Sequence, residues 1–406
     1  IFMSLTIGLA VFFPYIVVTG ALSPFSVGQL VLILGTNGAL EFFTLSKYRV
    51  LLTADQKTYV ISLASLVHII INTIIVVVLG TMKVNIVILR LIALLSIFLR
   101  SFLLMAYVKI NYKYIDYNAI PNNEALNKRW DALYLQILGA VHTGAPVIVL
   151  TLITRDLKLV SVYSIFNMVN VGLNGILGIF KSGLSASFGD VIARDEEKIL
   201  QKSYSEFEFS YYALITNVYS LAFITIMPFI RIYTSGVTDI NYDVPLIGFL
   251  FILNGLLYNL KTPQGMLVIS AGMFRETRVQ TTIQGLIAVI IGLVLTPFIG
   301  IYGVLIASIL SNIYRDIDLT FFTPRNITKL PVRDTIKRII IVFISVIIIC
   351  FPFLNIELNP NSYLQWIKYA IMVGIYACIV TLIINVLFDR DTSIGVINRL
   401  TRMVKR

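Results

Sequence analysis

Apolar segments about 20 residues long follow one another along the whole chain, separated by polar connections. An α-helix needs roughly 20 predominantly apolar residues to cross the hydrocarbon core of a bilayer. The pattern therefore predicts an all-α polytopic membrane protein. Its twelve predicted spans cover residues 1–22, 25–46, 58–80, 85–109, 131–153, 159–183, 207–231, 244–272, 279–297, 300–322, 337–354 and 363–388.

The composition supports a membrane protein and argues against a large soluble enzyme. Of the 406 residues, 58% are hydrophobic and 13% are charged, whereas a soluble domain is about 45–50% apolar and ~25% charged. Cys350 and Cys378 show no metal-ligand spacing, and His68 and His142 lie in different spans. We therefore predict no metal, no cofactor and no enzyme activity, and we interpret the histidines as hydrogen-bonded interior side chains.

The basic residues are distributed unevenly between alternate connections. The chain has 32 Lys and Arg residues and a formal charge of +11. Alternate connections, at 47–57, 109–130, 181–208, 273–278, 315–338 and 389–406, hold 24 of these residues, and the opposite connections hold four. Cytoplasmic loops are enriched in Lys and Arg. The asymmetry thus places both ends of this chain in the cytoplasm, and it explains the charge without a nucleic-acid partner.

Polar side chains recur at helical spacing inside several predicted spans. At about 100° per residue they form stripes along one helix face. The members are Tyr163, Asn167, Asn170, Asn174 and Lys181 in span 159–183, Asn254, Tyr258 and Lys261 in span 244–272, and Ser308, Asn312 and Arg315 in span 300–322. Single polar residues commonly hydrogen-bond across packed helices. Stripes of this length favour a water-filled cavity instead, with donors and acceptors suited to sugar hydroxyls.

Four cations lie within predicted spans. Arg90 and Lys368 are close to span ends and can snorkel to the membrane surface. Arg100 and Lys261 lie about nine and eleven residues from the inner ends, roughly 14–16 Å by helical rise, so we expect both to face an interior lumen. Such a lumen concentrates anions, and Arg suits bidentate contact with phosphate. We take Arg90 as a further candidate contact.

Carboxylates are expected to be scarce within the spans. Glu41 is interpreted as the only one well inside a span, and Asp131 begins another span. Transport needs a driving force, so both are candidate carriers of a counter-ion, H⁺ or Na⁺. The alternative is that water simply hydrates the Glu41 carboxylate, because Glu41 lies about five residues from the inner surface.

Three segments resemble bacterial polysaccharide flippases of the multidrug/oligosaccharidyl-lipid/polysaccharide exporter superfamily. They are "LLTADQKTYV" (51–60), "HTGAPVIVLTLITRDLKLVSVYSIFNMV" (142–169) and "SASFGDVIARDEEKILQKSYSEFE" (185–208). The resemblance implies two pseudo-symmetric bundles around a central cavity, as in MATE-like transporters. It implies an incomplete N-terminal lobe at 1–130 without its first helical hairpin, a six-helix lobe at 131–322, and an extra helix pair with a basic tail at 323–406.

The resemblance also implies a function. Such proteins move lipid-linked sugar units between leaflets by alternating access, so the expected substrate is an undecaprenyl-diphosphate-linked oligosaccharide in the bacterial cytoplasmic membrane. The diphosphate is expected at Arg100 and Lys261, and the sugars along Asn167–Asn174. Besides membrane lipids, other polysaccharide assembly proteins are candidate partners.

Three alternatives remain. A drug exporter of the same superfamily shares the fold, although a cationic lumen argues against organic cations. A peptidoglycan-precursor flippase is a closer relative that the sequence does not distinguish. A polysaccharide polymerase or ligase is also polytopic, but it needs a sizeable outer loop for its chemistry. The longest outer connection here, about residues 232–243, is short and holds no catalytic constellation.

Overall fold

The computed structural model describes residues 2–16, 22–115, 129–356, 358–390, 392–393 and 395–396. These residues are helical with short connections, and none of them belongs to a strand. The chain forms two compact units, Ile1–Asn122 and Asn123–Arg406.

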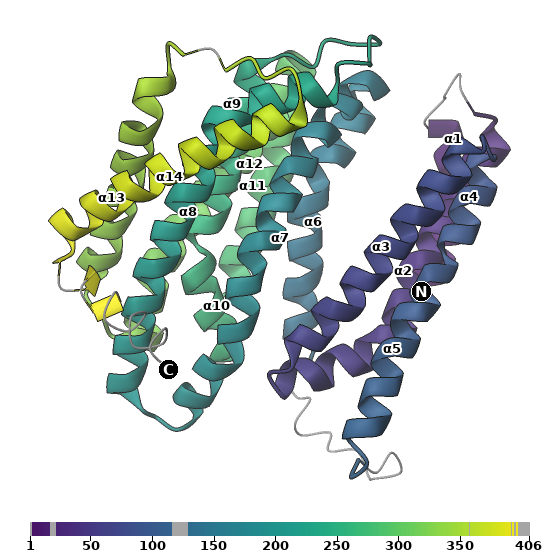
Figure 1. The fold of residues 1–406 in the computed structure, drawn as a ribbon. Coiled ribbons are helices and arrows are strands. Elements are labelled where there is room, and N and C mark those ends of the chain that lie inside the picture. Colours follow the sequence, from purple (N-terminus) through teal and green to yellow (C-terminus); the bar gives the residue numbers. More distant parts are fainter. Residues whose placement is uncertain are drawn as a thin grey trace. The chain divides into compact units, whose positions relative to one another are not determined.

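The first unit is a set of helices wound back and forth (Figure 1). Its helices are α1 (Phe2–Ile16), α2 (Pro24–Ala54), α3 (Thr58–Thr81), α4 (Ile86–Ala93) and α5 (Leu95–Asn111). Helix α2 starts where Ser23 accepts a hydrogen bond from the Ser26 amide and Pro24 occupies the first turn, a position where its missing N–H costs nothing. Leu45, Leu52 and Leu104 form the buried centre of this unit between α2, α3 and α5.

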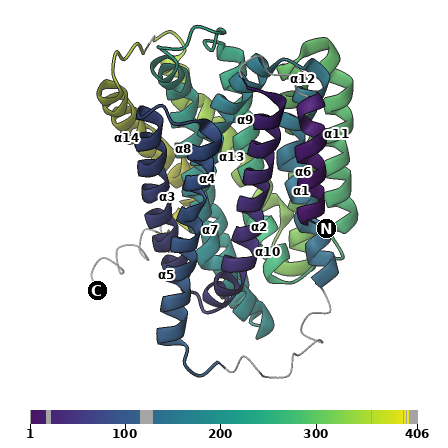
Figure 2. The same cartoon turned by 90° about the vertical axis from the view of Figure 1, so that its right-hand side faces the viewer.

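The second unit contains nine α-helices in the described residues. They are α6 (Arg129–Thr154), α7 (Leu157–Ala193), α8 (Glu197–Tyr233), α9 (Pro245–Leu260), α10 (Thr262–Ser270), α11 (Arg278–Ile299), α12 (Ile301–Thr323), α13 (Val332–Cys350) and α14 (Tyr363–Phe388). Short turns η2 (Pro324–Thr328) and η3 (Phe351–Phe353) flank α13. Helices α13 and α14 pack against α8 (Figure 1), and α11 lies beside both α12 and α6 (Figure 2).

Local sequence explains where these helices begin and reverse. Asp156 caps α7, because its carboxylate accepts from the Lys158 amide at 2.8 Å and so satisfies a free donor of the first turn. Gly300 separates α11 from α12 with φ +55°. That backbone conformation is unfavourable for residues with a Cβ, so glycine allows the two helices to form a tight antiparallel pair.

The fold-class prediction is confirmed: every predicted span coincides with a helix or with two consecutive helices. Ten segments of the described residues are long and apolar enough to cross a membrane. Helix α1 has 15 described residues, and α12 carries Arg315, Asp316 and Asp318, which lower its hydropathy. Two spans are broken, at Leu94 and at Lys261. Helices α13 and α14 belong to the second compact unit together with the helices that they pack against. The division of the chain into three domains stays a prediction.

Many large apolar side chains point outward. On α3 alone, Leu63, Ile69, Ile74 and Val77 are each more than half exposed. Contiguous exposed apolar surface of this kind is rare on soluble monomers, whereas hydrocarbon solvates it without cost. The interior of the second unit is instead close-packed around Tyr219, Phe251 and Phe166.

Candidate functional site

The central feature of the second unit is a break in a membrane-spanning helix. Helix α9 ends at Leu260, Lys261 lies at the break, and α10 starts at Thr262. Pro263 in the first turn of α10 has no amide hydrogen and cannot continue the preceding helix. The Tyr212 hydroxyl on α8 donates to the Leu260 carbonyl at 3.0 Å. A side chain thus supplies hydrogen bonding at the break, as a membrane interior requires.

Lys261 begins a chain of polar contacts to α12 and back to α9. Its Nζ donates to Oδ1 of Asn312 and lies 4.8 Å from the centre of the Tyr258 ring. The Asn312 amide in turn donates to Oδ1 of Asn254 at 2.9 Å. The Asn312 side chain is 1% exposed, so its orientation is fixed by these two bonds. The structure therefore brings together Lys261, Asn254 and Tyr258, three residues that helical spacing had predicted to share one face.

His142 lies at the other side of this network. Its Nδ1 is 3.3 Å from the Ser311 hydroxyl, which donates to the Gln284 carbonyl at 2.7 Å. The ring also interacts electrostatically with Lys261. The contacts agree with the interpretation of His142 as a hydrogen-bonded interior side chain. Together they connect α6, α11 and α12 around the helix break.

The polar stripe on α7 is largely occupied by contacts between helices. The Asn170 amide donates to the Phe251 carbonyl at 2.9 Å, and Asn174 accepts from Asn259 at 2.7 Å. The buried Tyr163 ring packs edge-on against Phe251, with centroids 4.9 Å apart. Asn167 and Asn174 are half-buried. Helix packing thus accounts for Asn170 and Tyr163, while a role of the stripe in sugar binding stays a prediction.

In the first unit, Arg100 is paired with a carboxylate. Its Nη1 lies 3.2 Å from Oε1 of Glu41, and Arg49 reaches the same oxygen at 3.3 Å. The Arg100 side chain is 13% exposed and the Glu41 side chain 42%. Arg90, in the last turn of α4, is exposed. Sequence reasoning assigned separate roles to Arg100 and Glu41 and missed their pairing, because the two are 59 positions apart on different helices.

The prediction that Glu41 is the only carboxylate well inside a span is wrong. Asp316 lies inside the predicted span 300–322, and both of its oxygens are buried without a hydrogen-bond partner among the described residues. The charge count assigned residues 315–338 to a basic connection, so Asp316 was not recognised as a carboxylate inside the span. The Asp131 side chain lies outside the part of the chain whose side chains are described. Within the described residues no group of three or more His, Cys, Asp or Glu could hold a metal ion.

A second buried charge was also missed. Glu208 on α8 is 1% exposed and pairs with Nη1 of Arg338 on α13 at 2.8 Å. Three further donors, Tyr204, Gln264 and Thr335, each reach its Oε1 at 3.0 Å. Arg338 also contacts Asp389 at 3.2 Å. This cluster ties α8 to α10, α13 and the residue after α14, and only tertiary contact reveals it.

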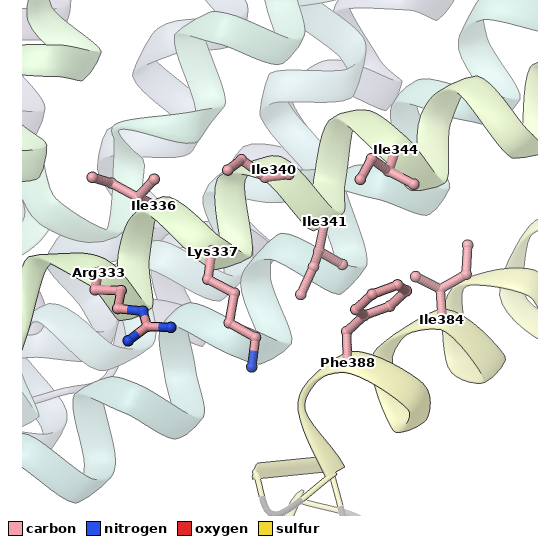
Figure 3. A pocket seen from close by; sticks show the side chains of 8 residues that line it. All are labelled: Arg333, Ile336, Lys337, Ile340, Ile341, Ile344, Ile384 and Phe388. Carbon is pink, nitrogen blue, oxygen red and sulfur yellow. The ribbon is translucent and has the colours of Figure 1, made fainter.

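An amphipathic groove runs between α13 and α14. Figure 3 shows Ile336, Ile340 and Ile344 following one another along α13, with Ile384 and Phe388 opposite them on α14. Its volume is about 250 Å³. Arg333 and Lys337 line the end where α13 begins. The groove thus combines an apolar lining with two cationic side chains at one end.

No protein-family model matches the chain, and no curated protein matches it. Among solved structures, it is similar to "Lipid II flippase MurJ, inward closed conformation", with a TM-score of 0.57 and 16% sequence identity over 96% of this chain and 81% of that chain. The chain has a MurJ-like fold. At this identity the likeness establishes the fold alone. In the MurJ structure this fold belongs to a lipid flippase and not to an enzyme.

Proposed function

We propose that this protein is a flippase for undecaprenyl-diphosphate-linked oligosaccharides. It carries these units across the bacterial cytoplasmic membrane for surface polysaccharide biosynthesis, by alternating access coupled to an ion gradient or to the membrane potential. The MurJ-like fold supports flipping of a lipid-linked substrate. The three segments that resemble polysaccharide flippases support the finer choice of substrate.

The observation that carries the proposal is Lys261 at the helix break. Its ammonium donates to the neutral amide of Asn312, not to a carboxylate. Broken helices at mid-membrane commonly form binding sites in transporters. A lysine serves as a point-charge contact for phosphate. We assign Lys261 to the diphosphate, with Asn254, Tyr258 and the half-buried Asn167 and Asn174 as contacts for the sugars.

The groove between α13 and α14 supports a substrate with a long apolar chain. Its isoleucines and Phe388 offer an apolar surface that fits a hydrocarbon chain. Arg333 and Lys337 at its mouth favour an anionic head group. A diphosphate attached to a polyprenyl chain has both properties.

Driving force and orientation complete the proposal. Glu41 and Asp131 remain the proposed carriers of H⁺ or Na⁺ from the sequence. The excess of Lys and Arg in alternate connections places both ends of this chain on the cytoplasmic side, so transport runs from the inner to the outer leaflet.

The test is surface glycan output in a strain that lacks its own polysaccharide flippase. Lys261→Gln should reduce glycan per unit of membrane-inserted protein by roughly tenfold or more, since loss of a buried charged contact costs about 2–5 kcal/mol. Lys368→Gln is the matched control, because Lys368 is exposed on α14. Normal output from well-inserted Lys261→Gln would refute the assignment.

A second candidate is a flippase for the peptidoglycan precursor, and the fold comparison favours it specifically. The two candidates differ in the head group that is carried. Purified protein in lipid vesicles should flip a polyprenyl-diphosphate oligosaccharide without peptide. Flipping of lipid II alone would establish the second candidate instead.

A further inference from the structure

Asp316 on α12 carries a carboxylate that the proposed phosphate contact does not use. Both oxygens are buried, and neither has a hydrogen-bond partner within the described residues. The residue lines a groove of about 430 Å³ between α9, α12 and α13. Apart from Asp316 and Thr320, the groove is lined by leucine, isoleucine and phenylalanine side chains of α9, α12 and α13.

The chemistry of the groove selects a proton as the ligand. An ionised carboxylate without a partner in apolar surroundings is costly, and such a group neutralises instead. A metal cation needs several oxygen ligands in one place, typically six to eight for calcium. Among the lining side chains only Asp316 and Thr320 carry oxygen. A proton is the cation that one carboxylate can hold alone.

Few charged or titratable groups face Asp316 from the surrounding helices. Lys261, at the break between α9 and α10, is hydrogen-bonded to Asn312, which lies four positions before Asp316 on the same face of α12, and the two charges interact. Tyr212 on α8 also interacts with Asp316. On α12 itself, Arg315 and Asp318 are paired with each other at 2.5 Å. Helix α13 contributes only apolar side chains to the groove. Lys261 is therefore the cation that favours the ionised form of Asp316.

These two residues couple a proton to an anion. While Lys261 is unoccupied, its positive field favours the Asp316 carboxylate. An anion bound to Lys261 cancels that field, so Asp316 takes up a proton more readily. By linkage, a proton on Asp316 also strengthens anion binding at Lys261 to the same extent.

We propose that Asp316 is a proton-binding site and that Lys261 couples its proton to the anion that the protein carries. The identity of that anion rests on the proposed function, whereas the proton site does not. Uptake forms one O–H bond on the carboxylate, and release returns the proton to water. The pair links proton binding at Asp316 to anion binding at the helix break.

The site can be tested without transport. Dicyclohexylcarbodiimide reacts with protonated carboxyl groups in apolar surroundings and leaves a stable N-acylurea. The purified chain in detergent is treated with it across a pH series, and the peptide that contains Asp316 is quantified by mass spectrometry. Labelling should fall as pH rises and be absent in Asp316→Asn. In Lys261→Gln the midpoint should move to higher pH by about one unit, the lower end of the effect of one opposite charge.

The control cation variant is Lys158→Gln. Lys158 is exposed and donates to the Asp239 carbonyl, so its loss should leave the midpoint unchanged. Failure to label wild-type Asp316 at any pH would overturn the proton site, and protection by Na⁺ at fixed pH would replace the proton with a metal cation. An unmoved midpoint in Lys261→Gln would overturn the coupling. If labelling behaves as expected while the wild-type chain gives no glycan in the flippase-null strain, the proposed function fails and the proton site stands.

Discussion

Arg100 on α5 and Glu41 on α2 form an ion pair, with Nη1 and Oε1 3.2 Å apart. Arg49 shares the same Glu41 oxygen, so two cations surround one carboxylate. The pair explains how a guanidinium is accommodated within an apolar span, since intramembrane charges are usually paired. If Arg100 binds phosphate, as the sequence predicts, the phosphate must compete with Glu41 for the guanidinium.

Substitution of Arg100 should therefore affect flipping in a graded order. Arg100→Lys keeps the charge but loses the planar fork, so it should be impaired less than Arg100→Ala. Arg100→Glu should be worst, because it places a second carboxylate beside Glu41. Surface glycan per unit of inserted protein is the measurement, and we expect a loss of roughly tenfold or more for Arg100→Ala.

Insertion and abundance separate this role from a purely structural one. If Arg100 only neutralises Glu41, Arg100→Ala should lower the amount of inserted protein, and Glu41→Gln added to it should restore that amount. Full glycan output from well-inserted Arg100→Ala would contradict the phosphate role.

The proposed orientation rests on the distribution of Lys and Arg, and cysteine labelling can test it. In a background without Cys350 and Cys378, Lys198→Cys should react with an impermeant thiol reagent only from the cytoplasmic side. Ser235→Cys, at the opposite end of α8, should react from outside. Both positions are exposed. Labelling of Lys198→Cys in intact cells would reverse the orientation and the proposed direction of transport.

Hydrophobic periodicity was sufficient to predict the spans, because crossing a bilayer imposes a length and a composition that local sequence must satisfy. The pattern also placed Asn254, Tyr258 and Lys261 on one face, and the structure joins Lys261 to Asn254 through Asn312. Residues on one helix obey helical spacing, so the shared face of these three residues could be predicted from the sequence.

Contacts between side chains on different helices could not be predicted from the sequence in this way. Glu208 and Arg338 are 130 positions apart, and nothing in either local segment indicates the other. Asp316 lies in the segment 315–338, which the charge pattern assigned to a connection. Its lack of a partner depends on α9 and α13 closing over it, which is a property of packing and not of sequence.

A pH-dependent contact lies in the turn between α2 and α3. The Tyr112 hydroxyl donates to Asp55 at 2.5 Å, and Lys57 lies 2.9 Å from the same carboxylate oxygen. The Tyr112 hydrogen bond, followed by that of Lys57, lowers the pKa of Asp55 below its ordinary value of 3.8. A lowered folded-state pKa contributes stability above the unfolded value, and this stability is lost as pH falls through the folded value.

Tyr112→Phe keeps the buried ring and removes the hydroxyl. The variant should melt at a lower temperature than wild type at neutral pH, and the difference should shrink once the pH falls below 3.8. Thermal unfolding in detergent across this range is the measurement. Tyr114→Phe is the control, because Tyr114 is exposed. A difference that does not change with pH would show that the hydroxyl acts without Asp55.

The buried pair of Glu208 and Arg338 should dominate the attachment of α13 to α8. Arg338→Met leaves the Glu208 carboxylate, 1% exposed, without its cation, and breaking a buried pair in this way costs about 3–5 kcal/mol. The comparison is Arg231→Met, which breaks the exposed pair of Arg231 with Asp243 at 3.0 Å and should cost at most ~1 kcal/mol.

The double variant Arg338→Met with Glu208→Gln removes both charges and should recover part of the loss, since no unpaired charge remains. The measurement is unfolding in detergent followed by tryptophan fluorescence, to which Trp366 contributes; its indole donates to the Thr225 carbonyl of α8 at 3.1 Å. Equal losses in Arg338→Met and Arg231→Met would show that the buried pair contributes no more than a surface one.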